Sequence, residues 1–425
     1  MAKIVILGAG LAGTLMAYEL KPALRSEDEL VVVGQGPTYH FVPSNPWVAA
    51  GWRSKVDIEV SLPEVMSRKN IRYIDKGGKR LHPEKNFLEL TDGTSLPYDY
   101  LIIATGPDLA FDEVDGLGPD RFTHSICHVD HAEKASNALK AFIKDPGPIV
   151  VGASQGASCF GPAYEFAFIL DTELRRQRLR HKVPMTFVTP EPYIGHLGLD
   201  GVGDTKGLLE SELRKRHIKW IINATIKSVN PQNMLVDQLA EDGKIRASFD
   251  LPFSYSMILP AFRGVRAVYG IDGLTNARGF VLVDRGQRNP SFQNTFAIGV
   301  CVAIAPTGPT PVPVGVPKTG FMIESMVTAA THNVGALLRG VTPDAEATWN
   351  AVCLADFGDR GIAFVAEPQI PPRNVNWSSQ GVWVHYAKQA FEKYYLRKMR
   401  KGESEPFYER WIIQALGIHR LTRTR

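Results

Sequence analysis

The sequence is poor in cysteine, with four among 425 residues. So few thiols cannot form a disulfide-stabilised scaffold, and we expect them to be catalytic, redox-active or simply buried. Each cysteine stands in a different sequence context and therefore needs its own interpretation. The four positions are Cys127, Cys159, Cys301 and Cys353.

Long apolar runs are also missing. No segment approaches the roughly 20 apolar residues of a membrane-spanning helix, and the N-terminal strand from Ile4 leads straight into glycines, unlike a secretory signal. The patterns CxxC and HExxH do not occur, so we expect no metal site. With 44% hydrophobic residues, the chain is long enough for two or three domains with large cores.

The formal charge of +4 is unevenly distributed. Residues 388–425 contain ten Lys and Arg against four Asp and Glu, a local charge of +6, which leaves −2 for the rest of the chain. A basic end on a nearly neutral body indicates an anionic partner surface, either a membrane or a nucleic acid. A solvated basic helix is the plain alternative.

Near the N-terminus, a GxGxxG turn stands between two expected elements. Residues 3–7 form an apolar strand, a helical run reaches about Leu24, and residues 30–33 form a second strand. This βαβ context predicts a dinucleotide-binding unit, with the diphosphate at the helix N-terminus. An acidic residue usually ends the second strand to hold a ribose, but Gln35 stands there instead. The three glycines are Gly8, Gly10 and Gly13.

A second βαβ unit begins with an apolar strand at residues 149–151. The turn at residues 152–156 lacks the GxGxxG spacing that a nicotinamide nucleotide requires, and Cys159 stands at the entry of the helix expected near Tyr164. Because a helix N-terminus stabilises a thiolate, Cys159 is a candidate nucleophile. Cys353 lies in a context that suggests a loop, whereas Cys301 lies in an apolar run and is interpreted as core.

The remaining pattern predicts an α/β fold with two tandem Rossmann-like dinucleotide-binding domains, the first of them discontinuous, and a C-terminal region of amphipathic, membrane-anchoring helices. Aromatic and basic residues alternate at helical spacing from Trp383 to Met399 and again from Phe407 to Leu416, although core-docking helices stay an alternative. Further strands are expected at 185–188, 220–222, 257–259, 279–284 and 295–299, and a helix within 318–338. The expected domain boundaries are 1–110 and 279–345 for the first domain, 111–278 for the second, and 346–425 for the C-terminal region.

Six separated motifs give the chain a resemblance to a known family. They are FVPSNPW at 41–47, ASCFGPAYE at 157–165, PYIGH at 192–196, PKTG at 317–320, WNAVC at 349–353 and the C-terminal aromatic and basic stretch. With these motifs the chain resembles the sulfide:quinone oxidoreductases, which are two-dinucleotide-binding-domain flavoproteins. The resemblance implies FAD as cofactor, hydrogen sulfide as donor, ubiquinone or another membrane quinone as acceptor, and peripheral (monotopic) attachment to the lipid surface of the cell inner membrane.

The resemblance also implies roles for individual residues. It pairs Cys159 with Cys353 beside the flavin, so that sulfide attacks one sulfur, leaves a persulfide and releases a thiolate that reduces the flavin. Cys127 is a third redox residue, for which covalent flavin attachment and polysulfide release both stay open. The resemblance associates His131 and His196 with the active site and with proton transfer on the quinone side, and it places Glu165 as a carboxylate of the sulfide pocket. Cofactor contacts are expected from Gly8, Gly10, Gly13, Gln35, Thr105, Gly106, Gly299, Val300 and Lys318, and quinone contacts from Phe357, Phe391 and Tyr408.

Other functions stay open on the sequence alone. A type II NADH:quinone dehydrogenase has the same architecture, but the altered second turn and the paired cysteines argue against it. The flavoprotein subunit of a cytochrome-linked sulfide dehydrogenase is opposed by the aromatic, basic C-terminus and by the absence of an export signal. No RNA-binding motif supports nucleic-acid binding, which is not expected. Assembly into a homo-oligomer is left undecided.

Overall fold

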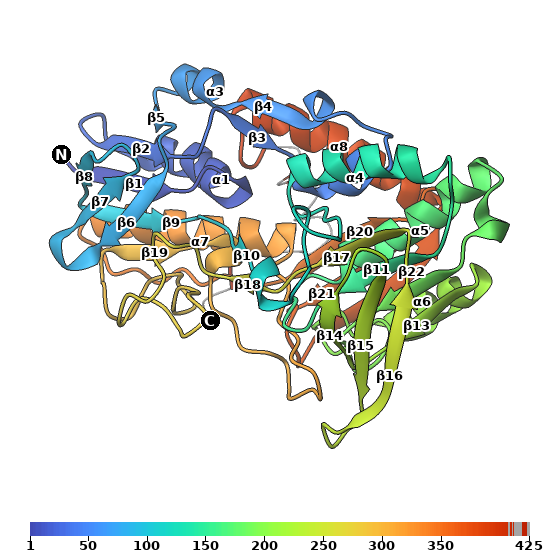
Figure 1. Cartoon of the computed structure of the whole chain (residues 1–425). Coiled ribbons are helices and arrows are strands. Elements are labelled where there is room, and N and C mark those ends of the chain that lie inside the picture. The colour runs from blue at the N-terminus through green and yellow to red at the C-terminus, as the bar shows by residue number, and fades with distance from the viewer. Residues whose placement is uncertain (407–408, 410, 412–418, 423–425) are drawn as a thin grey trace.

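The computed structural model describes residues 1–406, 409, 411 and 419–422 of the chain. Two parallel sheets with their covering helices lie side by side, and the C-terminal elements bridge them (Figure 1). Since both faces of each sheet are covered, the central strands are apolar along their whole length, as is usual in parallel sheets.

The first unit contains a five-stranded parallel sheet in the order β19–β9–β1–β2–β5. The helices α1 (Leu11–Leu20) and α7 (Gly320–Leu338) pack against each other on this unit. The strands are β1 (Lys3–Leu7), β2 (Glu29–Val33), β5 (Arg72–Ile74), β9 (Tyr100–Ile103) and β19 (Thr295–Ala297). A late segment of the chain thus returns to complete the first sheet, which the sequence predicts as a discontinuous domain.

The second unit contains a four-stranded parallel sheet in the order β13–β12–β11–β17. Its strands are β11 (Ile149–Ala153), β12 (Met185–Val188), β13 (Ile218–Ile221) and β17 (Tyr255–Leu259). Its helices are α4 (Val129–Phe142), α5 (Gly161–Arg176) and α6 (Thr205–Lys215). The two βαβ units expected from the sequence are therefore both present.

Smaller antiparallel elements decorate the two units. The largest, β14 (Ala224–Val229), β15 (Asn233–Leu239) and β16 (Ile245–Pro252), extends away from the body (Figure 1). A second set comprises β6 (Gly78–His82), β7 (Phe87–Leu90) and β8 (Ser95–Pro97). The remaining pairs are β3 (Thr38–His40) with β4 (Glu59–Ser61) and β10 (Asp108–Leu109) with β18 (Phe262–Arg263), and the short helices are α2 (Asn45–Ala49) and α3 (Leu62–Arg68).

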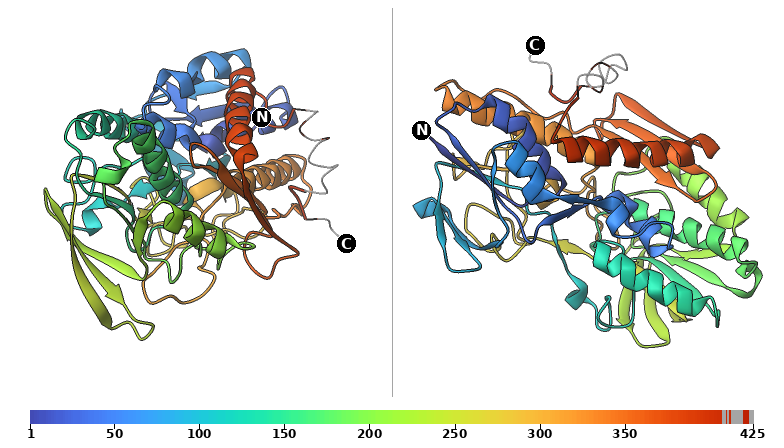
Figure 2. Two further views of the ribbon diagram at one scale, coloured as in Figure 1. Left: turned by 90° about the vertical axis from the view of Figure 1, so that its right-hand side faces the viewer. Right: turned by 90° about the horizontal axis from the view of Figure 1, so that it is seen from above.

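The C-terminal region adds an antiparallel sheet and a long helix. The strands β20 (Ala351–Asp356), β21 (Gly361–Glu367) and β22 (Val375–Gly381) lead into α8 (Val382–Lys401). Helix α8 packs on β20 and β21 at one end and on β4 of the first unit at the other, and Figure 2 shows it running across the body. This helix thereby holds the C-terminal sheet against both units.

One expected strand is absent from the structure. Residues 279–284 form no strand, and Val281 makes only isolated bridges to Thr275 and Val302. The reason is local: Gly279 has φ of +80°, outside the β region, and the Asp284 carboxylate accepts a 2.9 Å hydrogen bond from the Arg288 amide in a turn. Among the residues that the structure describes, no helix has both the length and the apolar character needed to cross a bilayer.

Candidate functional site

The glycine turn after β1 has the geometry of a dinucleotide diphosphate site. Gly8 has φ of +114°, and a Cβ there would lie 2.3 Å from the Ala104 carbonyl oxygen. A Cβ on Gly13 would lie 1.9 Å from the Gly8 oxygen, so helix and strand approach closely only without a side chain. A Cβ on Gly10 would meet no protein atom within 4 Å, and no side chain caps α1. The helix N-terminus therefore offers free amides to an anion.

Neighbouring positions extend this cradle along the carboxyl ends of the strands. Gly106, three residues beyond β9, has φ of +68° with open space where a Cβ would be, and Thr105 Oγ1 donates to its carbonyl at 3.1 Å. Gln35 is exposed at the end of β2 and its backbone bridges to Lys76. Its amide is therefore free to contact a hydroxyl, as expected in place of the usual carboxylate.

The far end of the cradle is formed by the turn after β19 and by the residues before α7. Gly299 has φ of +82° and lies so close to α1 that a Cβ would be 2.9 Å from Ala12 Cβ. Val300 beside it is half-buried. Lys318 is half-buried two residues before α7, with Nζ 5.0 Å from the Phe280 ring centre, and burial lowers its pKa to about 8. The Lys318 cation thus lies next to the N-terminus of α7.

Three cysteines converge where the two units and the C-terminal sheet meet. Cys127 precedes α4, Cys159 precedes α5, and Cys353 lies in β20, which packs against α5. The Cys159 thiol is near enough to interact electrostatically with Cys353, Cys127 and the Lys318 ammonium. All are free thiols and half-buried. The pair predicted from the sequence therefore lies together, beside the cation at the end of the cofactor cradle.

Two expectations about these cysteines are wrong. Cys353 lies in a strand rather than a loop. Burial raises the pKa of Cys159 to about 12, with Cys127 and Glu165 adding to the rise, whereas the sequence predicts a stabilised thiolate. The reason is that α5 begins at Gly161, two residues after the cysteine, and desolvation outweighs the helix dipole. Burial likewise raises the pKa of Cys353 to about 12 and of Cys127 to about 11.

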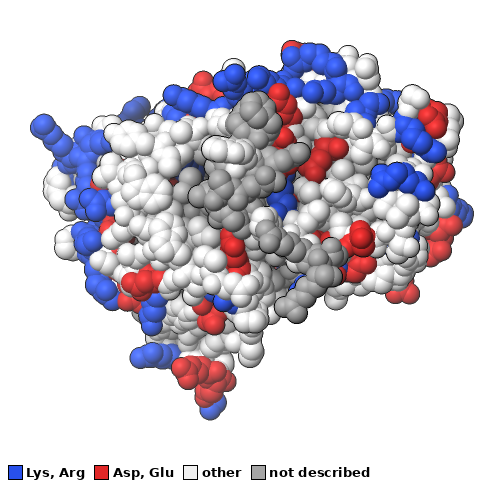
Figure 3. Space-filling view, turned by 180° about the vertical axis from the view of Figure 1, so that it is seen from behind, with Lys and Arg blue, Asp and Glu red and all other residues white. Residues whose placement is uncertain are grey.

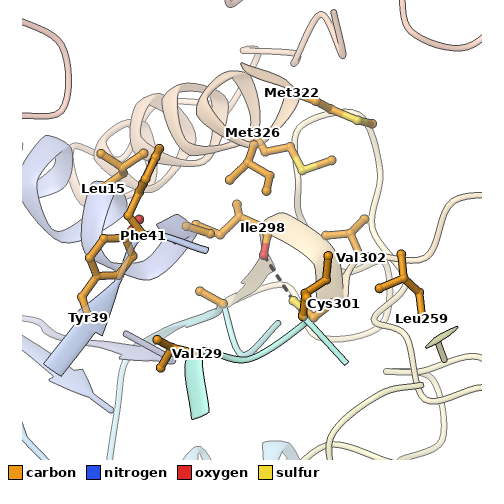
Figure 4. Packing of buried hydrophobic residues seen from close by; sticks show 14 of the residues in the cluster. Leu15, Tyr39, Phe41, Val129, Leu259, Ile298, Cys301, Val302, Met322 and Met326 are labelled. Carbon is orange, nitrogen blue, oxygen red and sulfur yellow. Dashed lines mark hydrogen bonds between the residues drawn. The ribbon is translucent and has the colours of Figure 1, made fainter. Parts of the chain in front are cut away.

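Cys301 is a core residue, as its apolar context predicts. It is 1% exposed, and its thiol donates to the carbonyls of Ile298 at 3.2 Å and Ile103 at 3.4 Å. Figure 4 shows Cys301 beside Ile298 among buried side chains of both units, with Met326 of α7 nearby. Its thiol is satisfied within the core and does not join the three converging cysteines.

The second glycine turn is closed by the chain itself. Gly156 N–H donates to the Pro313 carbonyl at 2.7 Å, and Gly315 N–H donates to the Ala157 carbonyl at 2.8 Å. A Cβ on Gly315 would lie 2.6 Å from Ser158 Cβ. The segment 313–315 therefore lies directly on the turn where a nicotinamide nucleotide would place its diphosphate.

A buried polar network adjoins the cysteines, and the sequence gives no sign that Lys388 belongs to it. Lys388 of α8 is 4% exposed and donates to the equally buried Glu165 carboxylate. Burial raises the pKa of Glu165 to about 7, and Lys388 opposes the rise. The Lys388 ammonium lies 5.4 Å from the Trp47 ring centre and close enough to influence Cys353. From sequence, Lys388 is one of ten basic residues near the C-terminus, and nothing marks it as buried.

The two predicted histidines occupy different surroundings. His196 is 4% exposed, its Nδ1 accepts a 3.1 Å hydrogen bond from Gly198 N–H, and burial lowers its pKa. His131 is half-buried against Phe111 and His128, and burial also lowers its pKa. Burial therefore disfavours the protonated form of both rings. A role for either in the reaction stays a prediction.

Glu191 is a buried residue that the sequence interpretation missed. Its carboxylate accepts hydrogen bonds from Tyr164 at 2.7 Å, Thr189 at 2.7 Å and the Leu197 amide at 2.6 Å. Glu191 follows β12, where a nucleotide-binding unit carries its ribose-binding acid. Here the acid instead points inward and fixes the loop that carries His196. That position relative to β12 is the one signal in the sequence that could have revealed it.

The residues predicted to contact the quinone differ in their exposure. Phe357 is 0% exposed, with its ring 4.4 Å from that of Phe168 and 5.9 Å from the Arg216 guanidinium. Phe391 of α8 is 40% exposed and packs on Phe41 with a centroid distance of 6.0 Å. Tyr408 lies outside the described residues. All three assignments stay predictions.

Comparison with known proteins agrees with this geometry. A family model described as pyridine nucleotide-disulphide oxidoreductase matches residues 2–329. The chain is 39% identical over 424 residues to a sulfide-quinone reductase of Aquifex aeolicus, covering 99% of this chain and 96% of the relative. The X-ray structure of the sulfide:quinone oxidoreductase from that bacterium superposes with a TM-score of 0.95, 38% identity and coverage of 100% and 98%.

A more distant structure shares the fold alone. The NDH2 of Plasmodium falciparum, determined in complex with NADH, superposes with a TM-score of 0.71 at 12% identity and covers 99% of this chain and 100% of that one. The two sheets, the glycine cradle and the matched family model define a flavoprotein of the pyridine nucleotide-disulphide oxidoreductase class, which implies a flavin cofactor. Within that class, the chain belongs to the sulfide:quinone oxidoreductase family.

Proposed function

We propose that the protein oxidises sulfide through Cys159 and Cys353, with FAD bound in the cradle of the first unit, and reduces a membrane quinone. The observation that supports this best is the convergence of the two thiols beside Lys318, at the end of the cradle. FAD suits the cradle because the Gly10 turn and the N-terminus of α1 fit a dinucleotide diphosphate. When bound, the flavin accepts two electrons from the thiol site and passes them to the quinone.

The protein's own contribution is to the sulfur chemistry. In the oxidised pair, hydrosulfide attacks one sulfur of the bridge, a sulfur–sulfur bond forms to give a persulfide, and the other cysteine leaves as a thiolate. Because burial raises the pKa of both thiols, the thiolate is unstable in this environment and is a good electron donor. The positive charge of Lys318 lies near Cys159 and stabilises the negative charge that forms when a cysteine leaves as a thiolate. Which cysteine carries the sulfur chain is not assigned, and Cys127 lies near enough to Cys159 to interact with it electrostatically.

The outer side of α8 supports attachment to a lipid surface. Its first half exposes Val382, Trp383 and Tyr386, and its second half exposes bases. Tyr395 and Met399, expected from the sequence to belong to the same anchoring pattern, instead pack inward at 4% and 0% exposure. Figure 3, seen from behind, shows a broad area without charged side chains and a rim of Lys and Arg above it. Aromatics beside bases suit peripheral attachment to an anionic membrane.

An anaerobic titration tests the function directly. The flavin absorbance of the holoenzyme is followed while sulfide is added, and a short-chain quinone is then mixed in. Bleaching by stoichiometric sulfide and recovery on adding quinone are expected. If sulfide leaves the flavin oxidised while dithionite bleaches it, the proposed function is wrong.

A further inference from the structure

A histidine–carboxylate pair lies beside the Glu165–Lys388 pair. Asp356, at the end of β20, is 0% exposed and its Oδ2 accepts a 2.9 Å hydrogen bond from the Trp47 indole. Its Oδ1 accepts from the Gly358 amide at 3.0 Å and lies 2.7 Å from His385 Nδ1. The carboxylate therefore fixes the imidazole with Nδ1–H toward Asp356. His385 Nε2, which faces the Gln389 side-chain amide at 2.9 Å, is left as the proton-exchanging atom.

The pair connects the buried site with the surface of α8. His385, Lys388 and Phe391 follow at three-residue spacing and so share one stripe of the helix. His385 is half-buried next to the 64% exposed Tyr386, whereas Lys388 is buried. Protons from outside therefore reach His385 more readily than they reach the Glu165–Lys388 pair.

Asp356 also touches Glu165. Its backbone amide hydrogen-bonds to the Glu165 carboxylate, and its negative charge opposes ionisation of that group. When His385 takes up a proton, the charge of Asp356 is neutralised, and Glu165 then loses its proton more easily. The other charged groups that face this site are Lys388 of α8 and the Arg53–Glu392 pair, whose guanidinium lies 4.9 Å from the Trp47 ring centre.

We propose that His385, positioned by Asp356, takes up the one proton that must enter from outside, that Glu165 then releases its proton toward the quinone, and that the proton held by His385 finally replaces the one lost from Glu165. The inference rests on the proposed function. Oxidation of hydrosulfide to the sulfur level gives two electrons and one proton, whereas reduction of a quinone to a quinol takes two electrons and two protons. One proton per turnover must therefore enter from outside, and His385 is the half-buried imidazole that stands between the exposed side of α8 and the buried Glu165–Lys388 pair.

His385→Gln separates this role from the sulfur chemistry, with His181→Gln as an exposed control. The holoenzyme is reduced with sulfide, mixed with a short-chain quinone in a stopped-flow instrument, and followed from about pH 5.5 to 8.5, around the histidine range. Bleaching by sulfide should stay within about twofold of wild type. Flavin recovery should slow about tenfold and lose its pH-dependent step, and added imidazole should restore part of the rate.

Each outcome has a distinct meaning. Recovery in His385→Gln with the rate and pH profile of wild type overturns the inference, as does equal slowing of both half-reactions, which indicates a structural role. Failure of sulfide to bleach the wild-type flavin instead refutes the proposed function. If His385→Gln does not bind flavin, Asp356→Asn is measured in the same way. That variant should shift the pH-dependent step to lower pH, because an imidazolium without its carboxylate is less stable, and an unshifted step counts against the inference.

Discussion

Gly156 donates its backbone N–H to the carbonyl of Pro313 at 2.7 Å, which joins the second glycine turn to the segment before α7. The Gly315 amide donates to the Ala157 carbonyl at 2.8 Å in the same contact. These backbone groups would otherwise face a nucleotide diphosphate. The segment therefore separates this chain from a nicotinamide-dependent enzyme of the same fold by backbone packing as well as by sequence.

NADH should not bleach the flavin of the purified holoenzyme under anaerobic conditions, even at millimolar concentration, because residues 313–315 lie on the turn that would bind it. Absorbance near 450 nm, the usual flavin band, gives the measurement, and the same sample should then bleach on adding sulfide. Rapid bleaching by NADH would show that the segment moves aside and would revive the NADH dehydrogenase alternative.

Cys353→Ala should abolish bleaching by sulfide, by at least about a thousandfold in rate, because no second sulfur remains to leave as a thiolate. FAD should stay bound, since the cradle around Gly8 and Gly10 is untouched, and dithionite should still reduce it.

Cys301→Ala is the matched control for that substitution. It also removes a buried thiol, but one that hydrogen-bonds to core carbonyls. It should lower stability by about 1 kcal/mol and keep bleaching by sulfide. Normal bleaching in Cys353→Ala would exclude the residue from the reaction.

The parts of this site that the sequence predicts are those set by local pattern. The turn at Gly8 to Gly13 follows from strand and helix periodicity, and the pairing of Cys159 with Cys353 follows from family motifs. The charge state of Cys159 does not follow, because it depends on desolvation by segments distant in sequence. The position of Cys159 just before a helix predicts a stabilised thiolate. In the folded structure, burial raises the pKa of this thiol and favours its neutral form.

Contacts between residues that are distant in sequence could not be predicted either. Lys388 has the sequence context of a solvated base, yet it lies buried against Glu165, which stands 223 residues earlier in the chain. Asp356 and Trp47 meet across 309 residues. No spacing rule relates such positions, so buried polar contacts between elements could be found only in the folded structure.

Removing one partner of the buried Glu165–Lys388 pair should destabilise the protein strongly. Above about pH 7, where Glu165 is ionised in the folded protein, Lys388→Met leaves its carboxylate without a cation, which typically costs about 3–5 kcal/mol. Adding Glu165→Gln should recover much of the loss, since the buried charge is then gone. Urea unfolding of wild type, the two single variants and the double variant gives the interaction free energy between Glu165 and Lys388. Additive losses in the double variant would mean that the pair contributes no interaction energy.

The raised pKa of Glu165 should also make the stability of the protein depend on pH. The pKa of Glu165 is raised from 4.5 to about 7 by burial, so the folded protein holds a proton that the unfolded chain releases. The free energy of unfolding should therefore fall as pH rises from about 4.5 to 7, on the order of 3 kcal/mol for this group. In Glu165→Gln this part of the slope should disappear. An unchanged slope in that variant would mean that Glu165 titrates normally.

Replacing Trp383 and Tyr386 with serine should weaken binding to liposomes that contain anionic lipid by at least about tenfold, because two exposed aromatic side chains are lost from α8. Truncation after Met399 is a poorer test, since Arg420 is buried against Glu324 of α7 and its loss would disturb the body. Phe122→Ser removes an aromatic of similar exposure, 40%, on another part of the chain and should leave binding unchanged. Dithionite should reduce the flavin normally in every variant, which shows that the fold is intact. If the double substitution sediments with liposomes as wild type does, α8 is not the attachment surface.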